Sequence, residues 1–118
     1  MTEHELKALR KLLFYSIPEA AVLVSASTAR PDGVSERAWR KWESGQVPVP
    51  EDVSNSIKAL VRYREDVVRK LTGKQEIRWF DSLEEWRQTG QADVLFCPYQ
   101  SAVAQVLSGD GCTLVYKR

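Results

Sequence analysis

The 118-residue sequence predicts a mainly helical α+β protein, with an N-terminal bundle of four to five helices and a small C-terminal α/β region. Apolar residues recur at helical spacing through residues 1–73. A Val-Pro-Val-Pro break at 47–50 separates three short helical patterns from a long one. Beyond Gly73, short apolar runs alternate with helical stretches. We therefore expect two parts, residues 1–73 and 74–118.

Composition excludes several classes of protein. An apolar fraction of 43% and four tryptophans argue against disorder. No apolar run reaches the length of about 18 residues that a membrane span needs, and no signal pattern opens the chain, so we expect a soluble cytoplasmic protein without a membrane partner. The net charge is only +1, but residues 1–73 hold 12 Lys and Arg against 10 Asp and Glu, whereas residues 74–118 hold 5 against 6.

Neither a cofactor nor a metal is expected. Cys97 and Cys112 lack metal-ligand spacing, and His4 is the single histidine of the sequence. The two cysteines are expected to be reduced and packed. With no glycine-rich phosphate loop and no histidine near a nucleophile, the sequence does not predict an enzyme.

The first helix is expected over residues 3–14, and a second begins at Pro18, whose ring suits a first helical turn. The inner stripe of the first helix is predicted to be Leu6, Leu9, Leu12 and Leu13. Its solvated side is predicted to be Lys7, Arg10 and Lys11. The loop 25–34 that follows is long for a helix-turn-helix motif. It is either a tolerated surface insertion or a source of phosphate contacts from Ser27, Thr28 and Arg30.

Residues 35–45 carry the strongest functional signal. At about 100° per residue, Trp39 and Trp42 gather on one face of a helix, opposite a polar face. That polar face consists of Arg37, Arg40, Lys41 and Ser44. Ser35 is placed to cap the first turn, and Gly45 to follow the last. The pattern fits a DNA recognition helix, and it also fits an ordinary amphipathic helix with a wet basic face.

A long helix is expected from residue 51 to 73, with one apolar seam that packs on the head, on a partner chain, or on both. The seam is Val53, Ile57, Leu60, Val67 and Leu71, with Arg64 filling the gap. After it we expect strands at 77–80, 94–96 and 113–116 and helices at 82–90 and 99–108, the first of these helices opened by a Ser82–Glu85 capping box. So small a region would be best covered by a second copy, which predicts a symmetric dimer.

The whole chain resembles the anti-CRISPR-associated repressors, which belong to the Cro-repressor-like (XRE-type) helix-turn-helix superfamily. The resemblance is carried by residues 5–13, by Glu19-Ala20-Ala21, and most specifically by 35–45 continued by 49–53. In the tail, residues 78–80 with Leu83, and then 99–104, resemble the family's dimerisation region.

The resemblance implies a homodimer that binds an inverted repeat of double-stranded DNA in its own operon's promoter and represses it. Some members of the family are described as binding their messenger RNA as well. Arg37 matches the family's key basic position. The dimerisation residues assigned to the tail are Trp79, Phe80, Phe96, Tyr99, Gln100, Val103 and Leu107.

We assign Arg37 to guanine readout, because its planar fork suits the O6 and N7 atoms. Arg40 and Lys41 serve either bases or phosphates, and Ser44 and Gln46 are expected to contact phosphates. The competing interpretation is an antitoxin-like module whose C-terminal region binds a partner protein. A third interpretation is a ligand pocket among Trp79, Trp86 and Phe96.

Overall fold

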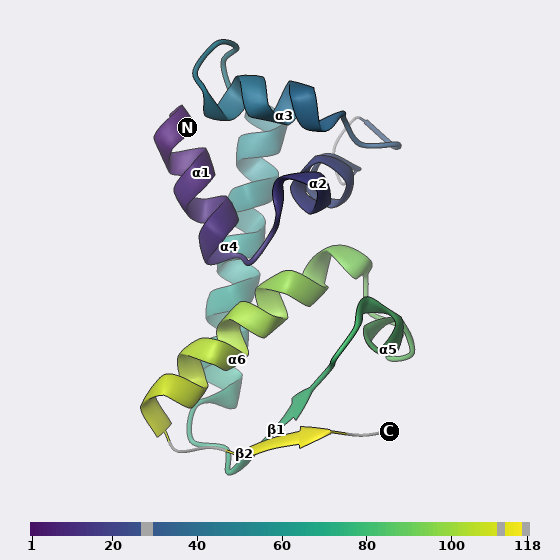
Figure 1. Ribbon diagram of the computed structural model, residues 1–118. Helices are drawn as coiled ribbons and strands as arrows, with labels where there is room; N and C mark the ends of the chain where they lie inside the picture. Colours follow the sequence, from purple (N-terminus) through teal and green to yellow (C-terminus); the bar gives the residue numbers. More distant parts are fainter. Residues whose placement is uncertain (27–29, 111–112, 117–118) are drawn as a thin grey trace. The chain divides into compact units, whose positions relative to one another are not determined.

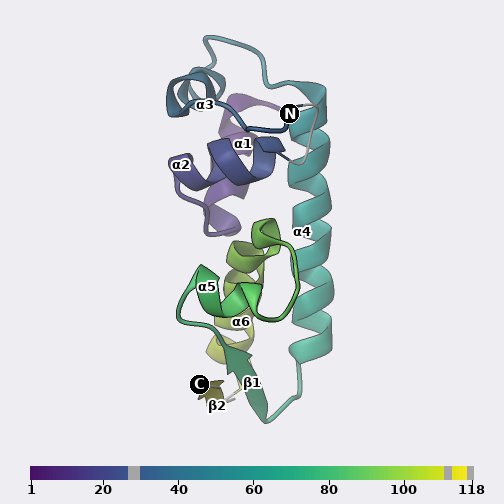
Figure 2. The ribbon, with the colours of Figure 1, turned by 90° about the vertical axis from the view of Figure 1, so that its right-hand side faces the viewer.

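The computed structural model describes residues 1–26, 30–110 and 113–116. It is mainly helical with a small α/β part, as the sequence predicts (Figures 1 and 2). Its elements, in chain order, are α1 Glu3–Leu12, α2 Ile17–Glu19, a π-helical stretch Ala20–Val24, α3 Glu36–Glu43, α4 Glu51–Leu71, β1 Glu76–Trp79, α5 Leu83–Arg87, a 3₁₀ turn Asp93–Leu95, α6 Phe96–Asp110 and β2 Thr113–Tyr116. Among the described residues, none of the helices is long and apolar enough to cross a bilayer.

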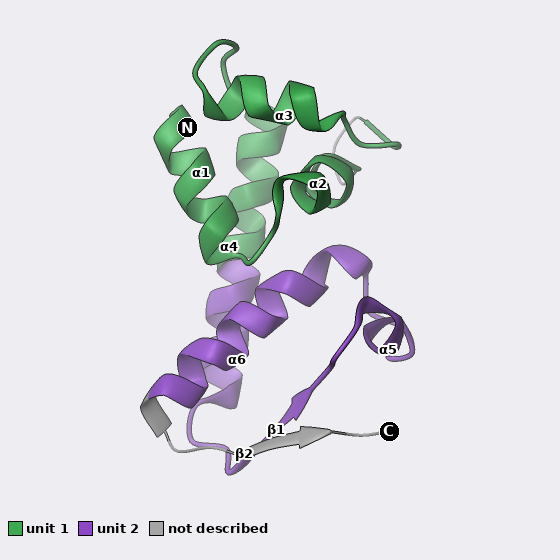
Figure 3. Cartoon of the chain, viewed as in Figure 1, with its two compact units in different colours: residues 1–61 green, residues 62–118 purple. Residues whose placement is uncertain are grey.

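The chain divides into two compact units, unit 1 over Met1–Val61 and unit 2 over Arg62–Arg118 (Figure 3). The division falls inside α4, before the predicted boundary at Gly73. In unit 1, α1, α2 and α3 gather beside the first half of α4 (Figure 2). In unit 2, α6 packs against the last turns of α4 and against β1 and α5.

Side-chain caps explain where the short helices of unit 1 begin. Thr2 and Glu5 form a capping box at α1, and Ser16 and Glu19 form another at α2. Ser35 Oγ accepts a hydrogen bond from the Ala38 amide at 3.1 Å, which confirms it as the cap of α3. Each cap satisfies backbone donors that the first helical turn leaves without a partner.

The core of unit 1 forms where the four helices meet. Trp39 and Trp42 pack edge to face with ring centroids 5.4 Å apart, so both indoles are core residues, as predicted. Leu6 and Leu13 of the predicted stripe are buried, but Leu12 is 38% exposed, so its placement in the stripe was wrong. The other large buried side chains of this core are Tyr15, Val24, Val53, Ile57 and Leu60.

In unit 2, β1 and β2 pair in parallel, with Ile77 opposite Leu114. Parallel neighbours need a crossover connection, and α5 with α6 supplies it. Two apolar clusters form around this connection. Ile77, Val103 and Val106 form the first, and Phe80, Trp86 and Phe96 form the second.

The predicted strand at 94–96 was wrong. Residues 93–95 form a 3₁₀ turn, and α6 already begins at Phe96 instead of near Tyr99. Three apolar residues in a row fit a helix as well as a strand, and Pro98 is tolerated in a first helical turn, so it does not mark the helix start. The Ala92 carbonyl fixes this turn by accepting hydrogen bonds from the Leu95 amide and from Trp86 Nε1, at 3.1 and 2.9 Å.

The other local predictions for the tail are confirmed in part. Ser82 Oγ caps α5 by accepting from the Glu85 amide, but the Glu85 carboxylate accepts from the Asp81 amide instead of completing a capping box. Cys97 is buried, which confirms its predicted packing. Cys112 lies outside the described residues.

Tyr63 provides a test of the packing in unit 2. Burial, reinforced by the neighbouring Tyr99, raises the pKa of its phenol to about 12. Because the folded pKa lies above the unfolded one, this contribution to stability is complete below about pH 10 and is lost as the pH rises towards 12. We expect absorbance at 295 nm to show one tyrosine ionising near pH 12 in the native protein.

The Tyr63→Phe variant keeps the ring and should lose this ionisation step. A residual shift from Tyr99, whose pKa is also raised by burial, should remain. Ordinary ionisation of all tyrosines near pH 10 in the folded protein would contradict the packing described here.

Candidate nucleic-acid interface

The polar face of α3 forms one shallow depression at the surface of unit 1. Its volume is about 360 Å³. It is lined by Arg37, Arg40, Lys41, Ser44 and Gln46. All five are among the residues that the sequence predicts for contact with DNA, and the structure places them together on one helix and the turn that follows it.

The two indoles force the cations outward. Trp39 is 0% and Trp42 6% exposed, and a helix that buries one side against a core presents the opposite side to solvent. Arg37 and Arg40 are accordingly exposed, and Lys41 is half-buried along its stem. We refer to the five lining residues as the α3 cationic surface.

The turn after α3 holds the end of this surface in place. Gly45 adopts a φ of +79°, a left-handed conformation that favours glycine and follows many helices. The Lys41 carbonyl then accepts hydrogen bonds from the Val47 amide and from Ser44 Oγ, at 3.2 and 3.1 Å. As a result, Gln46 is fixed beside the last turn of the helix.

The cations of this surface have few partners within the protein. Within the described part of the chain, the Arg37 side chain has neither an ion pair nor a hydrogen bond. Arg40 lies 3.7 Å from Glu36, but both side chains are more than half exposed, and an exposed pair of this kind holds its members only weakly. The guanidinium groups are therefore free to meet an external anion.

Behind the surface lies a buried ion pair between α1 and α3. The Arg10 guanidinium donates from Nε to Glu43 Oε2 at 2.6 Å and from Nη2 to Glu43 Oε1 at 3.1 Å. Arg10 Nη1 also donates to the Tyr15 carbonyl, and Trp39 Nε1 donates to Glu43 Oε2. With both side chains below 10% exposed, this pair sets how α3 lies on α1.

The prediction that Arg10 is solvated was therefore wrong. Arg10 follows Leu6 by four residues and precedes Leu13 by three, so it lies on the buried stripe of α1. That spacing was visible in the sequence. The partner that makes burial of a cation tolerable, Glu43, is 33 residues away and was not.

Glu43 is held as a carboxylate. Burial is the largest influence on it and opposes ionisation, but hydrogen bonds from Arg10 and Trp39 together outweigh it and place its pKa below the ordinary value of 4.5. The pair is thus charged on both sides at neutral pH.

A second depression of about 320 Å³ adjoins the first, because Arg40 and Ser44 line both. Its remaining lining residues are Lys7, Arg10, Ile17 and Glu43. Lys7 is exposed, and the sequence favoured a plain solvated role for it. The structure adds this lysine of α1 to the cations of α3.

Arg30 lies apart from these depressions. Its Nη1 donates to Asp52 Oδ2 at 2.6 Å, and its guanidinium carbon lies 5.7 Å from the centroid of the Trp42 ring. Nearby, Gly33 has a φ of +76°, and a Cβ there would approach the Ala21 carbonyl oxygen to 2.7 Å, so only glycine fits. Thr28 and Ser27 lie outside the described residues.

The tail residues assigned to dimerisation fall into two groups. Phe80, Phe96 and Val103 are buried within unit 2 itself. The other four, Trp79, Tyr99, Gln100 and Leu107, are only partly buried. Trp79 packs on the Ile77 cluster, whereas Trp86 and Phe96 belong to the other cluster, so the structure does not bring Trp79, Trp86 and Phe96 into one cluster.

The structure thus combines a helical unit, with buried indoles behind an exposed cationic helix, and a small α/β unit. A family model described as Aca2/YdiL-like matches residues 1–115. The chain belongs to this family, which confirms the resemblance to the anti-CRISPR-associated repressors.

Two relatives bear this out. The chain is 34% identical over 92 residues to the Aca2 repressor of Pectobacterium phage ZF40, covering 73% of each protein. It is 28% identical over 120 residues to the protein YdiL of Escherichia coli strain K12, covering 93% of this chain and 96% of that one. The first of these two relatives is named as a repressor.

The buried pair between Arg10 and Glu43 makes a stability prediction. Glu43→Gln removes one charge and leaves the Arg10 cation buried without a counter-ion, which should lower the free energy of unfolding by about 3–5 kcal/mol. Urea unfolding followed by tryptophan fluorescence measures the change.

The matched control is Glu36→Gln, which breaks the exposed pair with Arg40 on the same helix. It should cost less than about 1 kcal/mol. Equal losses in the two variants would contradict the proposed importance of the buried pair.

Proposed function

We propose that this protein is a DNA-binding transcriptional repressor that acts as a homodimer on an inverted repeat in the promoter of its own operon. The observation that carries the proposal is the α3 cationic surface. It presents five polar and basic side chains on the exposed side of α3, while the indoles on the opposite side of the helix are buried in the core. The kinship with a protein named as a repressor favours this role over the antitoxin-like alternative.

The geometry suits the major groove of DNA. That groove is about 12 Å wide and admits an α-helix. Arg37 lies in the first turn of α3 and is fully available, so its planar fork can donate two hydrogen bonds to guanine O6 and N7. Because the helix is held from behind by Glu43, the fork is presented at a fixed angle.

The other cations fix the position of the helix on the duplex. Arg40 and Lys41 lie about one turn beyond Arg37 and are placed for phosphate or base contact. Ser44 and Gln46 at the end of the helix, together with Lys7 of α1, extend the surface towards a phosphate backbone. Phosphate contacts of this kind supply affinity without sequence preference.

Dimerisation is assigned to unit 2. The partly buried residues of the predicted set, Trp79, Tyr99, Gln100 and Leu107, are the ones that retain surface for a second copy. Phe80, Phe96 and Val103 contribute indirectly, because they hold the unit together. A twofold dimer would present two copies of α3 to two half-sites, which is why we infer an inverted repeat.

The test is a fluorescence anisotropy titration with the DNA upstream of the gene, at several salt concentrations. Arg37→Ala should lose the preference for this duplex over a scrambled one, by about 1–3 kcal/mol or about 5- to 150-fold in affinity for each half-site. Arg62→Ala, which removes an exposed arginine from unit 2, is the matched control and should bind like the parent protein.

Equal affinity of the parent protein for the promoter and the scrambled duplex would refute the proposal. Sedimentation of the complex should show two protein chains for each duplex. An RNA copy of the same region, added as competitor, tests whether RNA is bound by the same surface. Competition that Arg37→Ala abolishes would place RNA there.

A further inference from the structure

Arg64 interrupts the apolar seam of α4. The seam residues at 57, 60, 67 and 71 are apolar, and Arg64 lies at the seam position between them. Its side chain is half-buried in unit 2. The end of its guanidinium reaches the surface, because neither Nη atom is among the buried side-chain atoms that lack a hydrogen bond. Both Nη groups are donors that an external ligand can meet.

Within the described residues, only one nitrogen of the Arg64 side chain has a hydrogen-bond partner. Arg64 Nε donates to Ser101 Oγ at 2.8 Å, and Ser101, on α6, is 2% exposed. Within the described residues Arg64 makes no other hydrogen bond and no ion pair. The contrast is Arg10, which uses three of its nitrogens on Glu43 and the Tyr15 carbonyl. The two Nη groups of Arg64, which form the end of its fork, are left for something else.

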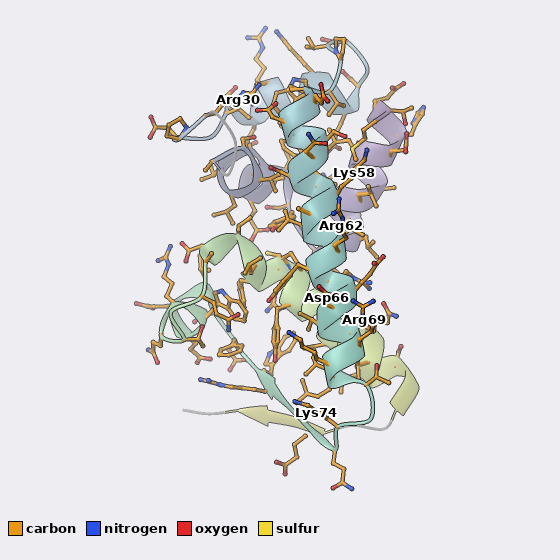
Figure 4. All side chains as sticks on the ribbon, turned by 180° about the vertical axis from the view of Figure 1, so that it is seen from behind. Arg30, Lys58, Arg62, Asp66, Arg69 and Lys74 are labelled. Atoms are coloured by element: carbon orange, nitrogen blue, oxygen red, sulfur yellow. The ribbon has the colours of Figure 1, made fainter. Side chains whose placement is uncertain are left out.

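The fork borders a depression of about 250 Å³ between α4 and α6. Its lining combines the cation with an apolar wall from Val68 and a side-chain amide from Gln105. Arg69 and Glu65 complete the lining. Arg69 is already paired with Asp66, which lies next to it along α4 (Figure 4).

The charges around the depression select the kind of anion. Arg64 is the one unpaired cation among the described lining residues, whereas Glu65 and the nearby Asp66 are negative. A dianion or a polyphosphate would meet these carboxylates, but a single carboxylate needs only the one fork. A planar carboxylate also matches two parallel N–H donors.

We propose that this depression binds a small monocarboxylate. The carboxylate accepts two hydrogen bonds from the Nη groups of Arg64, which Ser101 holds in place from behind. A short hydrocarbon portion lies on Val68, and the Gln105 amide donates to the ligand from α6. The proposal is independent of the proposed function, because none of these residues belongs to the α3 cationic surface.

The test uses sodium butyrate as the probe, titrated into the full-length ¹⁵N-labelled protein and followed by NMR. Saturable shifts are expected at the Arg64 Nε–H and the Gln105 amide, with affinity of about millimolar order for so small a probe. Butyramide, which has the same shape without the charge, and sodium chloride at matched ionic strength should both leave these signals unmoved.

Arg64→Lys keeps the charge but removes the fork, and should weaken butyrate binding at least tenfold. Arg62→Lys makes the same change at an exposed arginine on α4 (Figure 4) and should bind butyrate like the parent protein. The spectra of both variants also report directly whether unit 2 keeps its fold. A variant at 64 that misfolds is replaced by Gln105→Ala, which should weaken butyrate binding several-fold.

Three results would overturn the proposal. The first is the absence of saturable shifts with butyrate. The second is equal binding by the parent protein and a folded Arg64→Lys variant. The third is tighter binding of inorganic phosphate than of butyrate, because it would assign the fork to phosphate instead. These results do not depend on the promoter-binding experiment. Whether or not Arg37→Ala loses promoter binding, the butyrate titration has the same expected outcome.

Discussion

The buried ion pair between Arg10 and Glu43 is the interaction on which unit 1 depends. Glu43 is the last residue of α3, and it accepts hydrogen bonds both from Arg10 on α1 and from Trp39 one turn earlier on its own helix. A carboxylate with three charge-assisted or indole donors leaves little freedom for the roll of α3 about its axis. That roll decides which side chains reach solvent, so the core pair also determines the orientation of the cationic surface.

Two arginines at core-like positions show how differently the fold treats a buried cation. Arg10 is given a full carboxylate partner and becomes part of the framework. Arg64 donates instead to the Ser101 hydroxyl, which orients the guanidinium without neutralising its charge. Because a hydroxyl is neutral, the electrostatic attraction of the guanidinium for an anion remains. The first arrangement favours rigidity between helices, and the second favours recognition.

Features set by neighbouring residues could be read from the sequence, and features set by distant ones could not. The Ser35 cap, the glycine after α3 and the start of α4 follow from side chains within four residues of each boundary. The five residues of the cationic surface also follow, because one helix orders them by angle. The spacing of Arg10 put it on the buried stripe, but the partner that makes its burial tolerable, Glu43, lies far along the chain. The turn at 93–95 depends on the Ala92 carbonyl, which Trp86 of α5 also contacts, so the apolar run alone misassigned it.

The small net charge bears on how this surface can work. A protein of charge +1 has no strong overall field to draw it to a polyanion, and the negative residues of 74–118 weaken that field further. What unit 1 offers instead is a local array, with Arg37, Arg40 and Lys41 within two turns of one helix and Lys7 beside them. The electrostatic attraction of such an array extends over about a Debye length of 8–10 Å. The array therefore stabilises a closely docked complex more than it speeds long-range association. In the proposed function, selectivity rests on the shape and direction of the donors that a rigidly held α3 presents.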